Sequence, residues 1–278
     1  MIDSEQLKQD VVKAVEEIRA TNPMAGSITN TVTIDFVANA QLAVGGSAAM
    51  VYLPDEGEAL VAGGAIYLNM GTLFPIYEQT IPRAAKAAHD AGKPWVLDPV
   101  GLGIGSLRTQ LVNELKQYKP AIVRGNASEI IALAGLWGLE GEAADLSRVR
   151  GVDTTDTVDA ARDAAVALAR YTGGAVVVSG EVDLITDGTT VAKSYGGSPL
   201  MSKITGCGCS QGGVLAVYAC AAEPFTAAIC GTAVYNVAGT RAAAVADAPA
   251  SFKVAFIDEL YRATAQDIAD NRLELEEA

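Results

Sequence analysis

Short apolar segments alternate with amphipathic segments along most of this chain, and this alternation limits the possible folds more than any other feature. Apolar runs such as Ala65–Asn69, Pro94–Asp98 and Ala175–Ser179 read as strands, and a helical pattern lies between each pair. Strands that alternate with helices predict βαβ units and a mainly parallel sheet. Half of the 278 residues are hydrophobic, enough to cover such a sheet on both faces. We expect one α/β domain spanning residues 1–278.

The remaining elements follow from periodicity and turn residues. Asp187-Gly188 separates two apolar runs and predicts a hairpin that adds antiparallel strands at one edge. The polar segment Gly138–Asp156 is expected to be a loop. The predicted strands are Ala48–Leu53, Ala65–Asn69, Pro94–Asp98, Ala121–Arg124, Ala175–Ser179, Val182–Thr186 and Thr190–Ser194. The predicted helices are 5–20, Val32–Leu42, Glu78–Asp90, Ser106–Tyr118, Ser128–Trp137, Thr157–Tyr171 and most of the chain from Ser210 onward.

Charge and cysteine content exclude several classes of protein. The net charge of −13 argues against a nucleic-acid surface and against binding to anionic membranes. The first twenty residues lack the basic and apolar regions of a signal peptide, and no apolar run suits a membrane span. Four cysteines without a CxxC pair, and a single histidine, argue against a zinc site and a disulfide framework. A cytoplasmic protein is expected.

The segment 203–213 (KITGCGCSQGG) precedes a long apolar helix and is the strongest chemical signal. Glycines at Gly206 and Gly208 let successive backbone N–H groups, including that of Cys207, point into one anion hole at a helix N-terminus. Such a hole stabilises charge on a transferred phosphoryl group. Cys209 begins the helix, where a thiol pKa is lowered, so it is a candidate proton acceptor. The alternative is a glycine turn before a buried helix, with Cys209 as packing.

Asp98 ends a predicted strand, and Pro99 prevents that strand from continuing. Ligands bind at the carboxyl ends of strands in open α/β sheets, so a carboxylate here is a candidate magnesium ligand. The alternative is an aspartate that caps a turn.

The segment 124–130 (RGNASEI) joins a strand to a helix. Arg124 is a candidate for bidentate binding of phosphate oxygens. Glu129 lies in the first helical turn and is a candidate for holding Mg²⁺ through water. In the alternative interpretation, Asn126 is the N-cap and Glu129 completes a capping box; the two interpretations are compatible.

Asn30 and Met50 are candidates for contact with a small heteroaromatic ring, through the amide and the polarisable sulfur respectively. A helix cap and a core methionine are the alternatives. The chain contains no Walker A sequence, which argues against P-loop chemistry.

Taken together, these segments resemble the hydroxyethylthiazole kinases, a branch of the ribokinase-like superfamily. The matching pieces, in chain order, are SITN (27–30), FVANAQLAVGGSAAM (36–50), LNMGTL (68–73), VLDPVG (96–101), RGNASEI (124–130), SGEVDLITDG (179–188), KITGCGC (203–209) and SFKVAFIDEL (251–260). The resemblance implies a ribokinase-like three-layer fold, Mg²⁺ and ATP, the acceptor 4-methyl-5-(2-hydroxyethyl)thiazole, and a homotrimer with sites at subunit interfaces.

The resemblance also implies roles for individual residues. It implies that the thiazole contacts Asn30, Met50 and Gly206, and that ATP contacts Arg124 and Ser179. It places Asp98 and Glu129 beside the magnesium ion. The residue at the catalytic position, where the superfamily usually has Asp, is Cys209. Departures from the pattern include Gly26 in place of His, Asp35 in place of Asn, Ala49 in place of Pro, Ser179 in place of Thr and Cys207 in place of Thr or Ala.

The expected reaction is direct in-line transfer of the ATP γ-phosphoryl group to the hydroxyethyl oxygen. Alternatives within the fold are a kinase for hydroxymethylpyrimidine or pyridoxal and a nucleotide-hydrate dehydratase, whose Gly-rich loop carries Asp. A nucleotide-sensing or scaffold protein with a decayed site is the alternative outside enzymes. Retention of Asp98, Arg124, Glu129 and Cys209 argues against decay.

Overall fold

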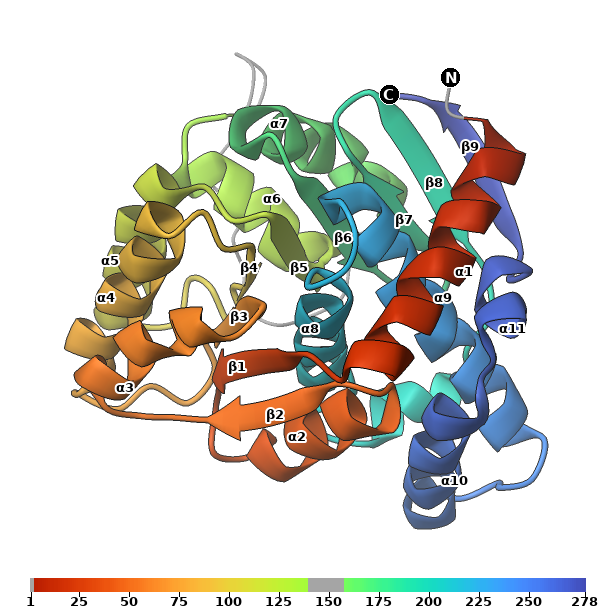
Figure 1. The fold of residues 1–278 in the computed structure, drawn as a ribbon. Coiled ribbons are helices and arrows are strands. Elements are labelled where there is room, and N and C mark those ends of the chain that lie inside the picture. Colours follow the sequence, from red (N-terminus) through yellow and green to blue (C-terminus); the bar gives the residue numbers. More distant parts are fainter. Residues whose placement is uncertain (1–2, 140–157) are drawn as a thin grey trace.

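A nine-stranded sheet forms the centre of the protein in a computed structural model that describes residues 3–139 and 158–278 (Figure 1). The strand order is β2-β1-β3-β4-β5-β6-β7-β8-β9. Neighbours from β2 to β6 run parallel, whereas β7, β8 and β9 are antiparallel additions at one edge. The strands are β1 (Met24–Ile28), β2 (Ser47–Met50), β3 (Ala65–Asn69), β4 (Trp95–Asp98), β5 (Ile122–Asn126), β6 (Ala175–Ser179), β7 (Asp183–Thr186), β8 (Thr190–Ser194) and β9 (Leu273–Glu277).

Helices cover both faces of this sheet and complete three layers (Figure 1). One face carries α1 (Ser4–Thr21), α2 (Ile34–Ala43), α8 (Cys207–Tyr218) and α9 (Pro224–Ala243), with α10 (Pro249–Arg262) and α11 (Ala265–Ala269) packed outside them. The other face carries α3 (Pro54–Ala59), α4 (Tyr77–Asp90), α5 (Ser106–Leu115), α6 (Ala127–Leu136) and α7 (Arg162–Thr172). Short 3₁₀ turns occupy Leu60–Ala62, Lys116–Tyr118, Val158–Ala161 and Pro199–Lys203.

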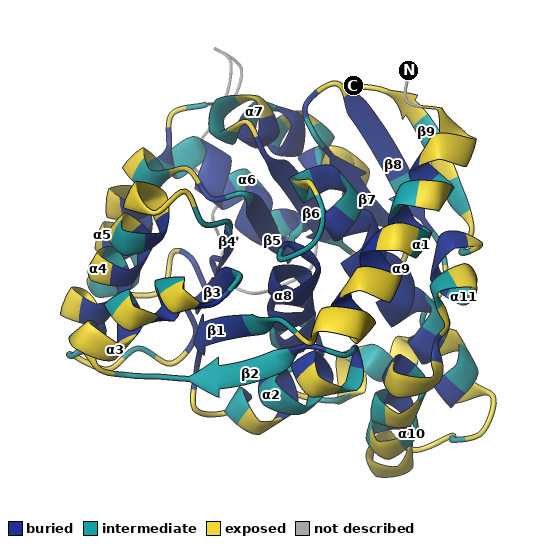
Figure 2. Ribbon diagram, in the orientation of Figure 1, coloured by how far each residue is buried: buried dark blue, intermediate teal, exposed yellow. Residues whose placement is uncertain are grey.

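Two hydrophobic cores lie on opposite faces of the sheet, and successive strand residues divide between them. Ala65 and Tyr67 of β3 belong to the core under α8, whereas Ile66 and Leu68 belong to the core under α4. This division follows from the two-residue period of a strand. The central strands and α8 are therefore almost entirely buried, and the exposed residues lie on the outer sides of the surrounding helices, in loops and on β9 (Figure 2).

Most predicted elements are confirmed to within two or three residues, including the late hairpin across Asp187-Gly188. Three elements were not predicted: β1, α3 and β9. The expectation that the chain from Ser210 onward is almost all helix is confirmed by α8 to α11, and β9 adds one final strand. The predicted loop 138–156 lies, from residue 140 onward, outside the described residues.

Within the described ranges, no helix is long and apolar enough to cross a membrane. All four cysteines are free thiols; Cys230 is buried in the core and Cys220 is half-buried beside it.

Candidate active site

Most of the predicted site residues meet at the carboxyl edge of the parallel strands, in front of the N-terminus of α8. Asp98, Asn126 and Ser179 are the last residues of β4, β5 and β6, and Arg124 lies two residues before the end of β5. Asn30 lies two residues beyond β1. The parallel register brings these strand ends side by side.

Asp98 is fully buried, and only one of its two carboxylate oxygens accepts hydrogen bonds. Its Oδ2 accepts hydrogen bonds from the Tyr67 hydroxyl at 2.9 Å and from Asn69 Nδ2 at 3.1 Å. Its Oδ1 is buried without a hydrogen-bond partner among the described residues. Burial raises the pKa of Asp98 to about 7, against the lowering effect of nearby Arg124. A buried oxygen of this kind can receive a cation or a proton.

Arg124 is buried and held at three points. Its Nε donates to Gln211 Oε1 at 3.0 Å and its Nη2 donates to Ser179 Oγ at 2.7 Å. Its Nη1 lies 3.8 Å from Asp98 Oδ2, which makes an ion pair away from solvent. The guanidinium also lies against Gly208, where an added Cβ would be 2.6 Å from both terminal nitrogens. This planar cation is therefore fixed between β6 and the start of α8.

The glycine turn before α8 has the geometry that the sequence predicted. Gly206 is the N-cap with φ 93°, a left-handed conformation that favours glycine. The first helical hydrogen bond is made by Ser210 N–H to the Gly206 carbonyl at 2.8 Å, so the N–H groups of Cys207, Gly208 and Cys209 precede the helical ladder. These three donors, next to Arg124, form a site for an anion.

The predicted lowering of the Cys209 pKa is wrong. Burial is the largest influence on the thiol and raises its pKa, and the negative charge of Asp98 raises it further, while Arg124 acts in the opposite direction. The dipole of α8 therefore does not dominate at this position, because the thiol is largely enclosed and faces a carboxylate. Burial also raises the pKa of Cys207, to about 12. Cys209 is protonated before substrates bind.

Asn30 contacts Cys209 directly and reaches Asp98 only through Asn69. Its Nδ2 donates to Asn69 Oδ1 at 2.9 Å and lies 3.5 Å from Cys209 Sγ. Its Oδ1 accepts from the Thr33 N–H at 3.2 Å, and Thr33 is the N-cap residue of α2. Asn30 therefore caps the turn that leads into α2 and at the same time presents its amide to the site.

Glu129 forms the capping box that the sequence allowed. Its Oε2 accepts from the Asn126 N–H at 2.9 Å, and Asn126 Oδ1 accepts from the Glu129 N–H at 2.9 Å. Its Oε1 accepts from the Gly101 N–H at 3.2 Å, in the loop after Asp98. Glu129 thus ties the loop after β4 to α6. Among the described residues, no group of three or more His, Cys, Asp or Glu side chains could hold a metal ion.

Met50 and two of the departures from the family pattern, Gly26 and Asp35, lie at the margin of this arrangement. Met50 ends β2 and packs, half-buried, against the α8-side core. Gly26 faces Leu60 across the sheet, with Leu60 Cδ2 2.5 Å from an added Cβ, so it lies on the opposite face from α8. Asp35 accepts a hydrogen bond from Asn39 within α2 and does not enter the site.

Three residues of the site were not singled out from the sequence: Tyr67, Asn69 and Gln211. Asn69 ends the correctly predicted strand β3, so its position beside Asp98 at the carboxyl edge was a usable signal. Tyr67 and Gln211 carried no such signal, because their roles depend on contacts between residues far apart in the chain.

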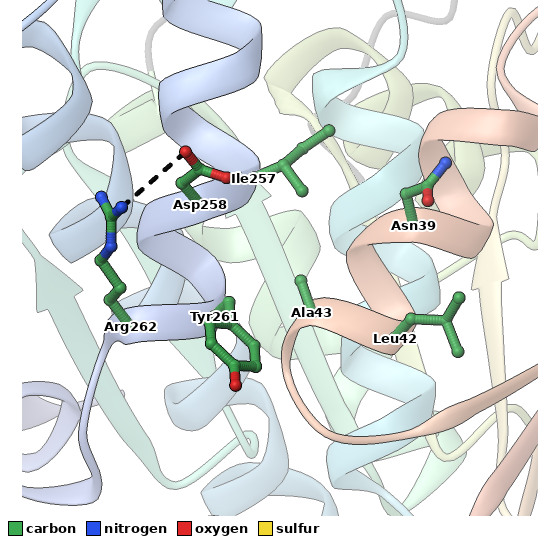
Figure 3. Close-up of a pocket in the computed structure, with 7 residues that line it drawn as sticks. All are labelled: Asn39, Leu42, Ala43, Ile257, Asp258, Tyr261 and Arg262. Carbon is green, nitrogen blue, oxygen red and sulfur yellow. Dashed lines mark ion pairs between the residues drawn. The ribbon is translucent and has the colours of Figure 1, made fainter.

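A surface groove between α2 and α10 lies apart from the predicted residues (Figure 3). It has a cavity volume of about 410 Å³ and includes none of the strand-end side chains. Its lining residues are Asn39, Leu42, Ala43, Ile257, Asp258, Tyr261 and Arg262. We place the chemistry at the strand ends, where buried charge and backbone donors converge.

Comparisons with known proteins bear on the family of this chain. The model of the "Hydroxyethylthiazole kinase family" matches residues 15–266. A hydroxyethylthiazole kinase of Bifidobacterium longum (strain DJO10A) is 45% identical over 285 residues, covering 96% of this chain and 91% of that protein.

Two solved structures are also similar. The hydroxyethylthiazole kinase protein from Pyrococcus horikoshii OT3 has a TM-score of 0.84 at 29% identity and covers 97% of this chain and 99% of its own. The pyridoxal kinase from Staphylococcus aureus in complex with AMP-PCP and pyridoxal has a TM-score of 0.62 at 17% identity, and the match covers 92% of this chain and 98% of the pyridoxal kinase chain. These similarities confirm the predicted ribokinase-like fold.

Proposed function

Because this chain belongs to the hydroxyethylthiazole kinase family, we propose that it transfers the γ-phosphoryl group of ATP to the hydroxyl of 4-methyl-5-(2-hydroxyethyl)thiazole. The product is the thiazole phosphate of thiamine biosynthesis and salvage. The observation that carries this proposal is the meeting of Arg124, Asp98 and the N-terminus of α8 beside Asn30, so that an anion site and a polar alcohol site share one edge of the sheet.

Arg124, Ser179 and the first turn of α8 would bind the phosphoryl group that is transferred. Loose phosphoryl transfer depends on positioning and on stabilisation of charge more than on a strong base. The N–H groups of Cys207, Gly208 and Cys209 would bind the equatorial oxygens of the transferred group. Arg124 would neutralise the remaining charge, and the bonds from Ser179 and Gln211 hold its guanidinium in place for that role.

The acceptor side falls to Asn30, Met50 and Gly206. Asn30 lies within reach of Cys209 Sγ, which supports a position for the acceptor hydroxyl between this amide and the anion hole. Gly206 presents backbone alone at the mouth of α8, because an added Cβ would be 2.8 Å from the Thr33 methyl group. Met50 would contact the thiazole ring from β2.

Asp98 would hold Mg²⁺ through its free Oδ1, together with ATP phosphate oxygens and water, and the ion would neutralise phosphate charge. Both Glu129 oxygens already accept backbone N–H groups, so Glu129 would act on the ion only through water and by fixing the loop after β4. The fit rests on a buried carboxylate oxygen that no other described group satisfies.

Cys209 would orient the acceptor hydroxyl through its S–H group, and the hydroxyl proton would pass, late in the reaction, to an oxygen of the transferred phosphoryl group. Its raised pKa means that the thiol begins protonated, so it does not generate an alkoxide in advance. A loose transition state needs little deprotonation of the nucleophile until the new bond forms. This explains how a thiol can occupy a position where related enzymes carry a carboxylate.

The substrate assignment is tested by ADP release from MgATP with a panel of thiazole, pyrimidine, pyridoxal and sugar alcohols. We expect the hydroxyethylthiazole to have the highest kcat/KM. If hydroxymethylpyrimidine or pyridoxal is phosphorylated faster at equal concentration, the acceptor is wrong and the kinase class stands. ATP hydrolysis or another reaction without alcohol phosphorylation contradicts the kinase class itself.

The proposal also covers domain organisation, assembly and location. We propose that residues 1–278 act as one domain, which agrees with the single continuous sheet of the described residues. We also propose a homotrimer and a cytoplasmic location.

A further inference from the structure

We propose that Asn69, which nothing in the family resemblance assigned, is a positioning residue that couples the acceptor side of the site to the phosphoryl-transfer side. The proposal rests on the function proposed above. Asn69 is the last residue of β3 and is 1% exposed. Its amide makes four hydrogen bonds, two through each polar atom, and these reach Asn30 on one side and Asp98 on the other.

The orientation of the Asn69 amide is fixed by the backbone. The Gly71 N–H can only donate, and it lies 2.9 Å from one amide atom of Asn69, which must therefore be the oxygen. The other atom is then the NH₂ group, which donates to the Tyr67 hydroxyl at 2.8 Å and to Asp98 Oδ2 at 3.1 Å. Asn69 thus presents a donor to the carboxylate, and it cannot rotate to present its oxygen without losing the Gly71 bond.

The same argument fixes Asn30. The Thr33 N–H donates to Asn30 Oδ1, so the NH₂ group of Asn30 must face Asn69 Oδ1 and Cys209 Sγ. Two backbone N–H groups, of Gly71 and Thr33, therefore set the direction of a continuous chain of hydrogen bonds from Cys209 to Asp98. Asn69 is the link between the two ends of this chain.

The backbone packs closely against Asn30 and Tyr67, at two glycines. An added Cβ at Gly71 would lie 2.6 Å from both Cβ and Nδ2 of Asn30, so the backbone after β3 presses directly on that side chain. An added Cβ at Gly212 would lie 2.4 Å from the Tyr67 ring, so α8 holds this ring in the same way. Close packing turns a change at either end into a displacement at the other.

The consequence for the reaction concerns which Asp98 oxygen is available. Asn69 and Tyr67 both donate to Oδ2, so Oδ1 is left as the free oxygen. At the other end, Asn69 holds the Asn30 amide beside Cys209. One side chain therefore sets the position of the acceptor relative to the phosphoryl group, and in-line transfer is sensitive to such displacements.

The test compares Asn69→Asp with the wild-type chain in steady-state kinetics, using MgATP and the preferred alcohol. This variant has nearly the same shape and keeps an oxygen for Gly71 and Asn30, but it places its second oxygen against Asp98 Oδ2. We expect kcat to fall by about tenfold to a hundredfold, with the KM for the alcohol changed by less than about threefold. An unchanged kcat overturns the proposal.

Gln41→Ala provides the matched control, because Gln41 is also a buried amide with several bonds, to Ala25 O, Ser27 Oγ and Gly213 O, and lies away from Asp98. We expect this variant to lose thermal stability while the folded enzyme keeps its kcat. If Asn69→Asp behaves in the same way, losing stability alone, Asn69 is structural and the proposal fails.

A double-mutant cycle of Asn30→Ala with Asn69→Ala tests the link to the acceptor. We expect kcat in the double variant to be close to that of the worse single variant, because both changes break the same chain. If the effects of the two single variants multiply in the double variant, the two residues act independently and the coupling is overturned. If the wild-type enzyme prefers an alcohol other than the thiazole, the substrate proposal fails, and the same cycle run with that alcohol still decides the role of Asn69.

Discussion

At the scale of single residues, the site combines one buried cation with one buried carboxylate that stays incompletely paired. Arg124 Nη1 and Asp98 Oδ2 are 3.8 Å apart, a longer contact than the bonds Arg124 makes to Ser179 and Gln211. The arginine is thus held mainly by neutral partners, and its charge remains available to an anion. Asp98 keeps Oδ1 free because Tyr67 and Asn69 both donate to its other oxygen.

Cys209 is the residue whose role is most directly testable. We expect Cys209→Ala to lower kcat and to leave the KM for the alcohol nearly unchanged. General-base assistance is worth roughly 10²–10⁴-fold in typical enzymes. A protonated thiol that only orients the hydroxyl in a loose transition state contributes less than a base, so we expect a loss at or below the low end of this range. Cys209→Asp should retain activity, since a carboxylate is favoured at a helix N-terminus.

Cys207→Ala is the control for this experiment, because Cys207 is buried in the α8-side core. Wild-type turnover in Cys209→Ala would show that the thiol is packing and that the anion hole suffices. A loss of turnover in Cys207→Ala alone would identify the other cysteine as the important one.

Asp183 gives the protein a pH-dependent stability contribution outside the reacting groups. Its carboxylate accepts from the Gly180 N–H and from Asn236 Nδ2, and burial raises its pKa to about 6 despite these bonds. Because the folded state binds this proton more tightly than the unfolded state, the contribution of Asp183 to stability improves as the pH falls through about 6 toward 4.

We therefore expect the free energy of unfolding of the wild type, relative to Asp183→Asn, to increase between about pH 7 and about pH 4.5. The difference between the two chains is the informative quantity, because other acidic groups, such as Asp98, titrate in both. Denaturant unfolding at several pH values measures it. A difference that is constant with pH, or that changes in the opposite direction, would contradict the raised pKa.

Sequence reasoning identified Asp98, Arg124, Glu129 and Cys209 as members of one site because each follows or begins an element at the carboxyl edge of a parallel sheet. It did not identify Tyr67 or Gln211, since nothing local to these residues reports contacts made to Asp98 and Arg124. It also misjudged the Cys209 pKa. The helix dipole is visible in a sequence, whereas the burial that outweighs it is a property of the folded site.

At the scale of elements, α8 organises the site. It packs on α2 and on strands β1, β3, β4 and β5, so its N-terminus is held against both the acceptor and the phosphoryl sides. Its glycines serve two purposes: Gly206 ends the preceding loop in a left-handed turn, and Gly208 makes room for the Arg124 guanidinium. Any side chain at 208 must displace the cation.

We expect Gly208→Ala to raise the KM for ATP or lower kcat by about tenfold or more, as misplacement of a binding group by about 1 Å can do. Alanine favours helix over glycine by roughly 0.5–1 kcal/mol, so this loss of activity should come without a matching loss of thermal stability. Gly213→Ala, in the same helix, is the control.

An added Cβ at Gly213 would lie 2.7 Å from Val37 Cγ1 in the hydrophobic core, so this variant should lose stability and keep its KM for ATP. Wild-type ATP kinetics in Gly208→Ala would mean that Arg124 can move without consequence. Calorimetry and steady-state kinetics on both variants separate the two effects.

The elements that sequence reasoning missed share a physical cause. In β1, the segment MAGSI contains glycine and serine, and its strand character depends on burial between β2 and β3. The segment PDEGEA of α3 is polar and contains glycine, so it lacks an apolar stripe. The exposed, acidic β9 is specified mainly by backbone pairing with β8. In all three, tertiary contacts outweigh local preference.

At the scale of the whole molecule, the negative net charge of −13 opposes the approach of ATP, so the local donors must overcome a repulsive field. Arg124 is buried at the floor of the site, where bulk salt screens it less than it screens surface charges.

The family resemblance predicts that three chains assemble. We expect light scattering of the purified protein to give three times the chain mass, and activity to elute with that species. A stable, fully active monomer would contradict both the trimer and a site shared between subunits. A dimer or a tetramer would contradict the trimer itself.

The order of the strands also bears on how such enzymes diverge. Two of the three residues proposed to contact the alcohol, Asn30 and Met50, lie just after β1 and at the end of β2, at one end of the sheet, while Arg124 and Ser179 lie on β5 and β6. A gene duplicate could therefore accumulate changes in residues 24–50 and acquire a new acceptor while its nucleotide chemistry is inherited unchanged. An engineer could exchange the same stretch, provided that Asn69, the inner connection between the two halves, is left in place.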